Sequence, residues 1–158
     1  MADRLPMTHA GYEILKQELR RLRTRDRHEI VREIETARAH GDLSENAEYH
    51  AAKERQGHIE GRISTLEDRL ARAQVIEIGG EPPDAVRFGV TVALVDVETD
   101  EEVAYTLVGE DESDVAAGLI SVSSPVARAL LGKHIDDEVT VRVPKGTRQF
   151  EIRDIRFE

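Results

Sequence analysis

The polar segment Gly41-Asp42-Leu43-Ser44-Glu45-Asn46-Ala47-Glu48-Tyr49 separates two long helical patterns and predicts a turn between them. Two helices joined by so short a turn form a hairpin, and such a hairpin cannot bury its own tip. The turn therefore places two carboxylates, those of Asp42 and Glu45, at an exposed end of the fold. We expect them to act away from the body of the protein, inside a partner.

Apolar residues recur at spacings of three, four or a whole number of helical turns on both sides of the turn, as they do along one face of a helix. Thr8 is the predicted N-cap of the first helix, and Gly41 supplies the left-handed residue that ends it. The stripe of the first helix consists of Leu15, Leu19, Leu22, Ile30, Ile34 and Ala37. That of the second helix consists of Tyr49, Ala52, Gln56, Ile59, Ile63, Leu66, Leu70 and Ala73.

The two stripes predict an antiparallel α-helical coiled-coil hairpin over residues 1–78, with its acidic tip at residues 41–49. In each facing pair the two residue numbers add up to 85 or 86, so one turn near Leu43 satisfies every pair. The pairs are Ala37 with Tyr49, Ile34 with Ala52, Leu22 with Ile63, Leu19 with Leu66, and Leu15 with Leu70. The seam weakens in its middle, where Asp26 faces Ile59 and Ile30 faces Gln56. Arms of about 30 residues make a rod roughly 45 Å long.

The pattern changes at Gly79-Gly80-Glu81-Pro82-Pro83, which predicts a linker over residues 79–86. From residue 87 to residue 158 the apolar period is two, which is typical of half-buried strands. Strands are expected within residues 90–94, 103–107, 139–143 and 150–155. One short helix over residues 125–131 begins after Ser124 and ends at Gly132. The fold class is therefore α+β, with a helical hairpin followed by a small β-sheet domain.

Composition and charge exclude several classes of protein. The chain has no Cys, no apolar run of membrane-spanning length and no signal-like N-terminus, so we expect a soluble cytoplasmic protein without disulfides or membrane contact. Residues 1–78 carry 14 Lys and Arg against 15 Asp and Glu, whereas residues 79–158 carry 8 against 17. An acidic second half argues against a protein that binds duplex DNA, because neutralising phosphates requires clustered positive charge.

Asp42 and Glu45 allow two interpretations. Asp at an N-cap with Glu three residues later resembles a capping box, and this spacing taken alone favours a helix cap. The alternative is metal chelation, because two carboxylates one turn apart lie on the same face and Mg²⁺ accepts one or two protein carboxylates. Such a pair is a poor site by itself. It becomes a good one where a partner supplies further carboxylates, a second metal and a phosphate.

Residues 41–49, followed by His50-Ala51-Ala52-Lys53-Glu54, resemble the signature of the bacterial Gre transcript cleavage factors. The likeness extends over nearly the whole chain, through Met7-Thr8 with Gly11, Glu60-Gly61-Arg62-Ile63, Ala73-Gln74-Val75-Ile76 and residues 120–128. Leu43 stands where the GreB branch tends to have Arg, so the chain is more similar to the GreA branch.

The resemblance implies a function in transcription. Gre proteins insert their coiled coil through the secondary channel of RNA polymerase, where the tip acids, here Asp42 and Glu45, help hold the second Mg²⁺ and position the attacking water. The polymerase then cuts the backtracked RNA near its 3′ end, so the factor is a cofactor of another enzyme and not an enzyme itself. The resemblance also implies an FKBP-like C-terminal domain that grips the rim of the channel, and a monomeric factor.

Basic residues form a second group of candidates. Lys16, Arg20, Arg23 and Arg27 share one face of the first helix, which is either a solvated face or a patch for RNA phosphates. Arg38 and Lys53 are better candidates for RNA binding, because they lie within two or three turns of the tip and match the small basic patch of the GreA branch. Arg55 is a weaker third.

The turn formed by Ser121, Ser123, Ser124 and Pro125 is a candidate docking surface for the polymerase. Its alternative is a strand exit followed by Ser-Pro helix initiation. Two other readings of the whole chain remain open. One is a Gre-like protein that occupies the secondary channel and inhibits transcription, and the other is a coiled-coil adaptor whose tip is only a capped turn.

Overall fold

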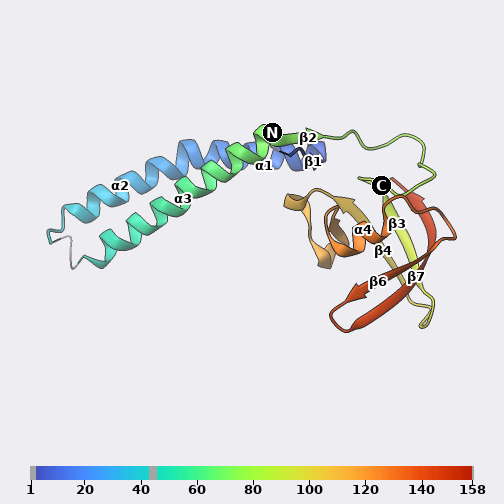
Figure 1. Ribbon diagram of the computed structural model, residues 1–158. Coiled ribbons are helices and arrows are strands. Elements are labelled where there is room, and N and C mark those ends of the chain that lie inside the picture. Colours follow the sequence, from blue (N-terminus) through green and yellow to red (C-terminus); the bar gives the residue numbers. More distant parts are fainter. Residues whose placement is uncertain (1–2, 43–45, 158) are drawn as a thin grey trace. The chain divides into compact units, whose positions relative to one another are not determined.

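The computed structural model of the protein describes residues 3–42 and 46–157 (Figure 1). Val143 is described through its backbone alone. The chain divides into two compact units. One contains Tyr12–Ala73, and the other contains Arg4–Gly11 together with Gln74–Glu158. Residues 4–11, near the start of the chain, thus group with the C-terminal unit. The division at residues 78 and 86 drawn from the sequence stays a prediction.

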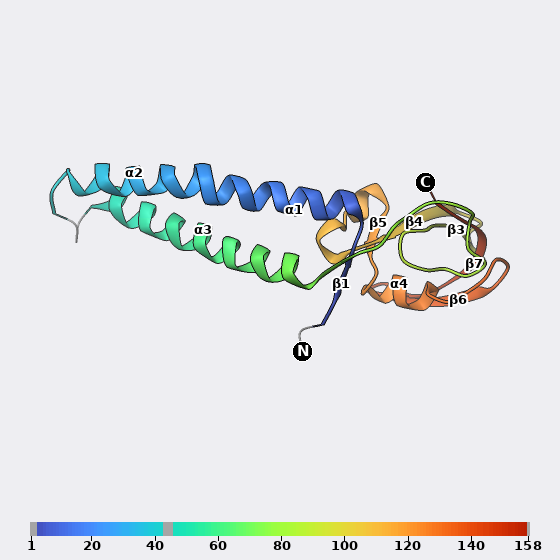
Figure 2. The same ribbon diagram turned by 90° about the horizontal axis from the view of Figure 1, so that it is seen from above.

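The helical unit is built from two arms that run side by side in both views (Figure 2). The first arm comprises α1 (His9–Arg21), a π turn (Leu22–Asp26) and α2 (Arg27–Arg38), and the second is α3 (Ala47–Arg72). Thr8 caps α1 as predicted, since its Oγ1 accepts a hydrogen bond of 3.0 Å from the Gly11 amide. The buried seam residues are Leu15, Leu19, Leu22, Ile30, Ile34, Ala37, Ala52, Ile63 and Leu66.

The π turn is the main difference from the single helix expected for the first arm. A π turn closes i→i+5 hydrogen bonds and so takes up one residue more than an α turn. The seam requires that extra residue, because Leu22 and Ile30 lie eight positions apart and not the seven of a heptad. Ile30 is 3% exposed, and Ile59 packs against the cluster of Ile30, Ile34 and Ala52. The apolar seam therefore continues through the region that was expected to be weak.

A short two-stranded sheet joins β1 (Leu5–Met7) to β2 (Ala73–Val75). The Ile76 amide donates to the Met7 carbonyl at 2.9 Å beside it. Ala73 was expected to lie on the second helix, and that prediction is wrong. Its backbone is extended, with φ −61° and ψ 135°, because α3 ends at Arg72 and the chain enters β2.

The C-terminal unit is a five-stranded sheet with the strand order β5-β4-β3-β7-β6. Its strands are β3 (Thr91–Asp96), β4 (Glu102–Val108), β5 (Leu119–Ser121), β6 (Glu138–Val143) and β7 (Gly146–Arg156). The pairing is antiparallel except between β4 and β5. Two 3₁₀ turns, Glu110–Glu112 and Val115–Ala117, precede β5. The four expected strands are present, and β5 is an addition.

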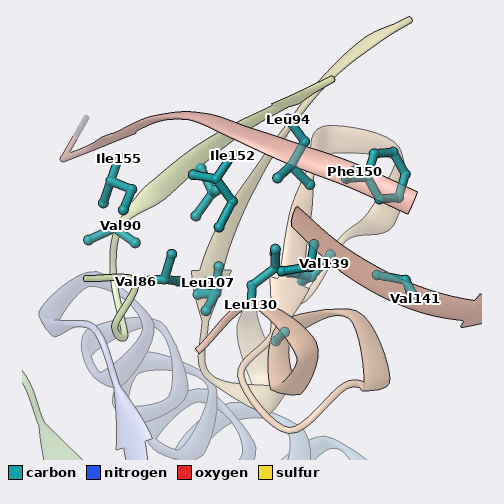
Figure 3. Close-up of a cluster of buried hydrophobic side chains, with 13 residues drawn as sticks. Val86, Val90, Leu94, Leu107, Leu130, Val139, Val141, Phe150, Ile152 and Ile155 are labelled. Atoms are coloured by element: carbon teal, nitrogen blue, oxygen red, sulfur yellow. The ribbon is translucent and has the colours of Figure 1, made fainter. Parts of the chain in front are cut away.

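Helix α4 (Pro125–Leu130) covers one face of this sheet (Figure 3). Ser124 begins it as predicted, accepting a hydrogen bond of 3.2 Å from the Ala127 amide, and Gly132 follows it with φ +81°. The core between them includes Val92, Leu94, Leu107, Leu130 and Ile152, each at most 1% exposed. Burying each such side chain contributes about 1.5–3 kcal/mol. The α+β class is confirmed, and in the described part of the chain no helix has the length and apolarity to cross a membrane.

Candidate functional site at the hairpin tip

The tip lies between the end of α2 at Arg38 and the start of α3 at Ala47. Asp42 is exposed in the connecting segment. Glu45 falls within residues 43–45, outside the described residues, so its place in the site stays a prediction. Gly41 has φ +105°, a left-handed conformation that favours glycine, as expected for the residue that reverses the chain. The helix stops slightly earlier than expected, with Ala39 as its C-cap.

Asn46, and not Asp42, is the N-cap of α3. Its backbone is extended, with φ −87° and ψ 97°, and its side-chain oxygen accepts a hydrogen bond of 3.0 Å from the Tyr49 amide. The interpretation of Asp42 as the cap of the second helix is therefore wrong. The physical reason is the starting point of α3, because a cap must stand directly before the first helical residue, which here is Ala47.

Asn46 also reaches the other arm of the hairpin. Its side-chain nitrogen donates to the Ala37 carbonyl at 2.6 Å, while its own carbonyl accepts from the His50 amide at 3.1 Å. One side chain thus links the end of α2 to the start of α3. The sequence does carry a signal for this role, because Asn ranks with Asp and Ser among the best N-caps.

The two predicted RNA-binding residues lie on different arms. Arg38 ends α2 and is exposed, with its guanidinium carbon 6.0 Å from the centre of the Tyr49 ring. Lys53 is exposed on α3 and donates to the Gln56 side chain at 3.0 Å. Arg55 pairs with Glu33 across the seam. The contact of Arg38 with Tyr49 is a cation–π interaction, which orients the guanidinium without neutralising its charge.

The basic face of the first arm is largely paired with carboxylates. Arg27 donates to both oxygens of Glu60, at 3.0 and 2.8 Å, and Arg23 lies 3.1 Å from Glu67. The hydrogen bond from Arg27 lowers the pKa of Glu60. Lys16 lies 3.6 Å from Glu13. These pairs favour the interpretation as a solvated, ion-paired face over an RNA-binding patch.

Among the described residues of the tip, Asp42 carries ligands of the kind that Mg²⁺ prefers. Asp42 offers hard carboxylate oxygens, as a Mg²⁺ ligand must. Within residues 3–42 and 46–157, no three His, Asp or Glu side chains gather closely enough to hold a metal ion. The donor set fits an ion whose remaining ligands come from another molecule.

The predicted docking turn is held by local hydrogen bonds. The hydroxyls of Ser121 and Ser123 lie 2.8 Å apart, and Ser123 also donates to Glu110 at 3.0 Å. Ser124 caps α4, and Pro125 stands exposed at its first position. The turn therefore performs the helix initiation expected of Ser-Pro. Its use as a docking surface stays a prediction.

The fold and the tip define a two-unit protein in which a helical hairpin presents an acidic turn and a separate β-sheet unit forms the main core. Comparison with known proteins also divides the chain into two successive regions. Residues 5–75 match the family model "Transcription elongation factor, N-terminal", and residues 81–157 match "Transcription elongation factor, GreA/GreB, C-term".

Relatives cover the chain from end to end. The transcription elongation factor GreA of Trichlorobacter lovleyi is 51% identical over 158 residues, covering 100% of both chains. That of Phenylobacterium zucineum is 52% identical over 155 residues, covering 98% of this chain and 99% of its own. Among solved structures, the GreA factor homolog Gfh1 of Thermus thermophilus is 33% identical over 97% of this chain and 99% of its own, with a TM-score of 0.44. This score is too low to support a structural argument.

The chain belongs to the GreA/GreB family of transcription elongation factors and is of the GreA type. The resemblance seen in the tip signature is thereby confirmed. The protein is a factor that acts on RNA polymerase and is not itself an enzyme.

Proposed function

We propose that this factor stimulates RNA polymerase to cleave backtracked RNA, with Asp42 and Glu45 contributing to the reaction at the polymerase active site. The observation that carries the proposal is the identity of the cap. Because Asn46 caps α3, the carboxylate of Asp42 is not required for starting that helix. An exposed carboxylate at the end of a hairpin is well placed to enter a partner.

Asp42 and Glu45 would hold a Mg²⁺ ion together with carboxylates of the polymerase. When bound, such an ion activates a water for attack on a phosphodiester and stabilises the leaving oxygen. The factor's own part is to bring hard oxygen ligands into the site and to orient the attacking water by hydrogen bonding. The described residues of the free factor gather no group of three metal ligands, which suits this division of labour, because the ion would be bound only in the complex.

Arg38 and Lys53 would bind the phosphates near the 3′ end of the backtracked RNA. Both side chains are exposed on the arms next to the tip, and Arg38 is oriented by Tyr49. Their attraction to phosphate is electrostatic and independent of base identity, which suits a factor that acts on transcripts of any sequence. The exposed Pro125 and the adjoining serines would dock on the polymerase, and the factor would act as a cytoplasmic monomer.

Two conservative substitutions at the tip test the proposal. Asp42→Asn and Glu45→Gln remove charge and keep side-chain size. We expect both to abolish factor-stimulated cleavage in a stalled polymerase complex, because amides are poor Mg²⁺ ligands compared with carboxylates. For Asp42→Asn we expect a free energy of unfolding within about 0.5 kcal/mol of the parent, as for most surface changes.

The same assay separates the remaining interpretations. Parental cleavage by both variants would contradict the metal hypothesis. A factor that slows elongation without stimulating cleavage would be a secondary-channel inhibitor. Binding to polymerase with no effect on either activity would indicate an adaptor.

A further inference from the structure

Asn46 differs from an ordinary N-cap because both its side-chain oxygen and its side-chain nitrogen form hydrogen bonds. The oxygen accepts from the Tyr49 amide at 3.0 Å, which is the capping bond, and the nitrogen donates to the Ala37 carbonyl at 2.6 Å. Capping needs only an acceptor, so Asp or Ser would serve equally for α3. The second bond needs a donor at the same side chain, and an amide supplies both.

The bond to Ala37 anchors the tip to a firmly packed point of the first arm. Ala37 is 2% exposed and is the last buried residue of that arm. Tyr49, whose amide Asn46 holds, packs on the cluster of Ile30, Ile34 and Ala52. The segment that carries Asp42 therefore begins and ends at positions tied to each other through one half-buried side chain.

We propose that Asn46 is a positioning residue for transcript cleavage, acting through Asp42 by fixing the separation of the two helix ends that flank the tip. This inference rests on the proposed function of Asp42. A cap alone would stabilise α3 and leave the tip free to vary in position. The link to Ala37 adds the constraint that a ligand of a shared ion needs, since the reacting groups must be held within a fraction of an ångström.

Asn46→Asp is the discriminating variant. The ionised carboxylate keeps the acceptor that caps α3, but it has no proton to donate and would face the Ala37 carbonyl oxygen. We expect the maximal cleavage rate at saturating factor to fall about 10- to 100-fold, the scale of a misplaced reacting group. The factor concentration that gives half-maximal cleavage should stay within about twofold of the parent value, since under about 0.4 kcal/mol of binding would be lost.

Two further measurements separate positioning from folding. In NMR spectra of the isolated Asn46→Asp factor, the Tyr49 amide should keep a hydrogen-bonded shift while the Ala37 carbonyl shift changes. Thr8→Ala is the matched control, because it removes the cap of α1 and leaves the tip bonds in place. We expect Thr8→Ala to lower the melting temperature and to preserve the maximal cleavage rate.

Parental cleavage by Asn46→Asp at saturating factor, with the Ala37 shift changed, would overturn the inference. A loss that appears only as a higher half-maximal concentration would overturn it as well, because it would indicate a role in binding. If Asp42→Asn retains cleavage, the proposed function itself fails. If Asp42→Asn is inactive and Asn46→Asp is fully active, only the positioning role fails.

Discussion

At the scale of single residues, the Asn46 amide and the Asp42 carboxylate have different roles at the tip. Asn46 satisfies backbone groups of both helices, whereas Asp42 lies in the connecting segment between them. The sequence predicted the polar turn and its candidate metal ligand, but its spacing favoured Asp42 as the cap of α3, whereas the cap is Asn46. Asp42, Ser44 and Asn46 are all good cap residues, and local sequence does not settle which of them stands directly before the first helical turn.

Two glycines give a matched prediction about packing at the residue scale. A Cβ on Gly109 would lie 2.5 Å from the Pro6 carbonyl oxygen and 3.0 Å from a carboxylate oxygen of Glu112. We expect Gly109→Ala to lower the free energy of unfolding by about 1–3 kcal/mol, the usual range for overpacking. Chemical denaturation, which reports this free energy directly, is the measurement.

Gly57→Ala is the control for that prediction. Gly57 lies inside α3, and a Cβ there would meet no atom within 4 Å. Replacing an exposed helical glycine with alanine should stabilise the fold by about 0.5–1 kcal/mol. Equal effects of the two substitutions would contradict the close approach of residue 109 to β1.

At the scale of elements, the π turn explains a detail of the sequence pattern. The residue numbers of facing pairs add up to 85 from the base of the hairpin to Asp26 and to 86 from Ile30 to the tip, so the sum changes at the end of the π turn Leu22–Asp26. The second arm keeps a regular three–four spacing throughout. The extra residue therefore belongs to the first arm. The change in the sum of the facing residue numbers could therefore have predicted the π turn from the sequence.

Deleting Thr24 tests this explanation. The deletion would bring Leu22 and Ile30 to heptad spacing. The five facing pairs that join buried or half-buried apolar positions would then all have the same sum, so a continuous α-helix could form. We expect helicity to be kept and the free energy of unfolding to change by less than about 1 kcal/mol, because the buried seam is retained.

Deleting Arg32, an exposed residue of α2, is the matched control. It would rotate Ile34 and Ala37 off the seam. The free energy of unfolding should fall by several kcal/mol, because losing one large buried side chain costs about 2–5 kcal/mol. Circular dichroism with thermal denaturation measures both variants. Equal losses would mean that the π turn does not absorb an inserted residue.

Ion pairs between the arms predict a dependence of stability on pH. The hydrogen bond from Arg62 lowers the pKa of Glu18 below its usual 4.5, and that from Arg27 lowers the pKa of Glu60. A carboxylate with a lowered pKa stabilises the fold above its unfolded pKa, and this contribution is lost as the pH falls through the folded pKa. Stability should therefore decline as the pH falls below 4.5.

The double variant Glu18→Gln and Glu60→Gln should flatten this decline when unfolding is followed between neutral and acidic pH. It should also be less stable than the parent at pH 7. Glu54→Gln, at an exposed position of α3, serves as the control. An unchanged pH profile in the double variant would exclude these two pairs as the cause.

Long helices and strands could be predicted from the sequence, whereas the shortest strands could not. In the hairpin arms and the longer strands the hydrophobic pattern repeats several times, so it identifies each element as a helix or a strand. The strands β1, β2 and β5 have three residues each, too few to display an alternation. Their positions depend on partners distant in the sequence, such as Met7 beside Ile76.

At the scale of the whole molecule, residues 4–11 group with the C-terminal unit although they precede the helical hairpin in the sequence. The Glu112 carboxylate accepts hydrogen bonds from the Thr8 amide at 3.0 Å and the Gly109 amide at 3.1 Å, and it also contacts the Thr8 hydroxyl. These bonds join β1 and the first turn of α1 to the segment before β5. Local patterns do not reveal such a link, because its partners lie 104 positions apart.

If the tip of this factor completes a metal site in RNA polymerase, the charge of Asp42 should set how much Mg²⁺ the cleavage reaction needs. The most direct test measures the maximal RNA cleavage rate of a stalled complex at saturating factor while Mg²⁺ is titrated, for the parent and for Asp42→Asn. We expect the parent to reach its maximal rate at low Mg²⁺, and the variant to need far more Mg²⁺ or never to reach that rate. Superimposable titrations, with equal maximal rates, would show that Asp42 does not help to bind the ion.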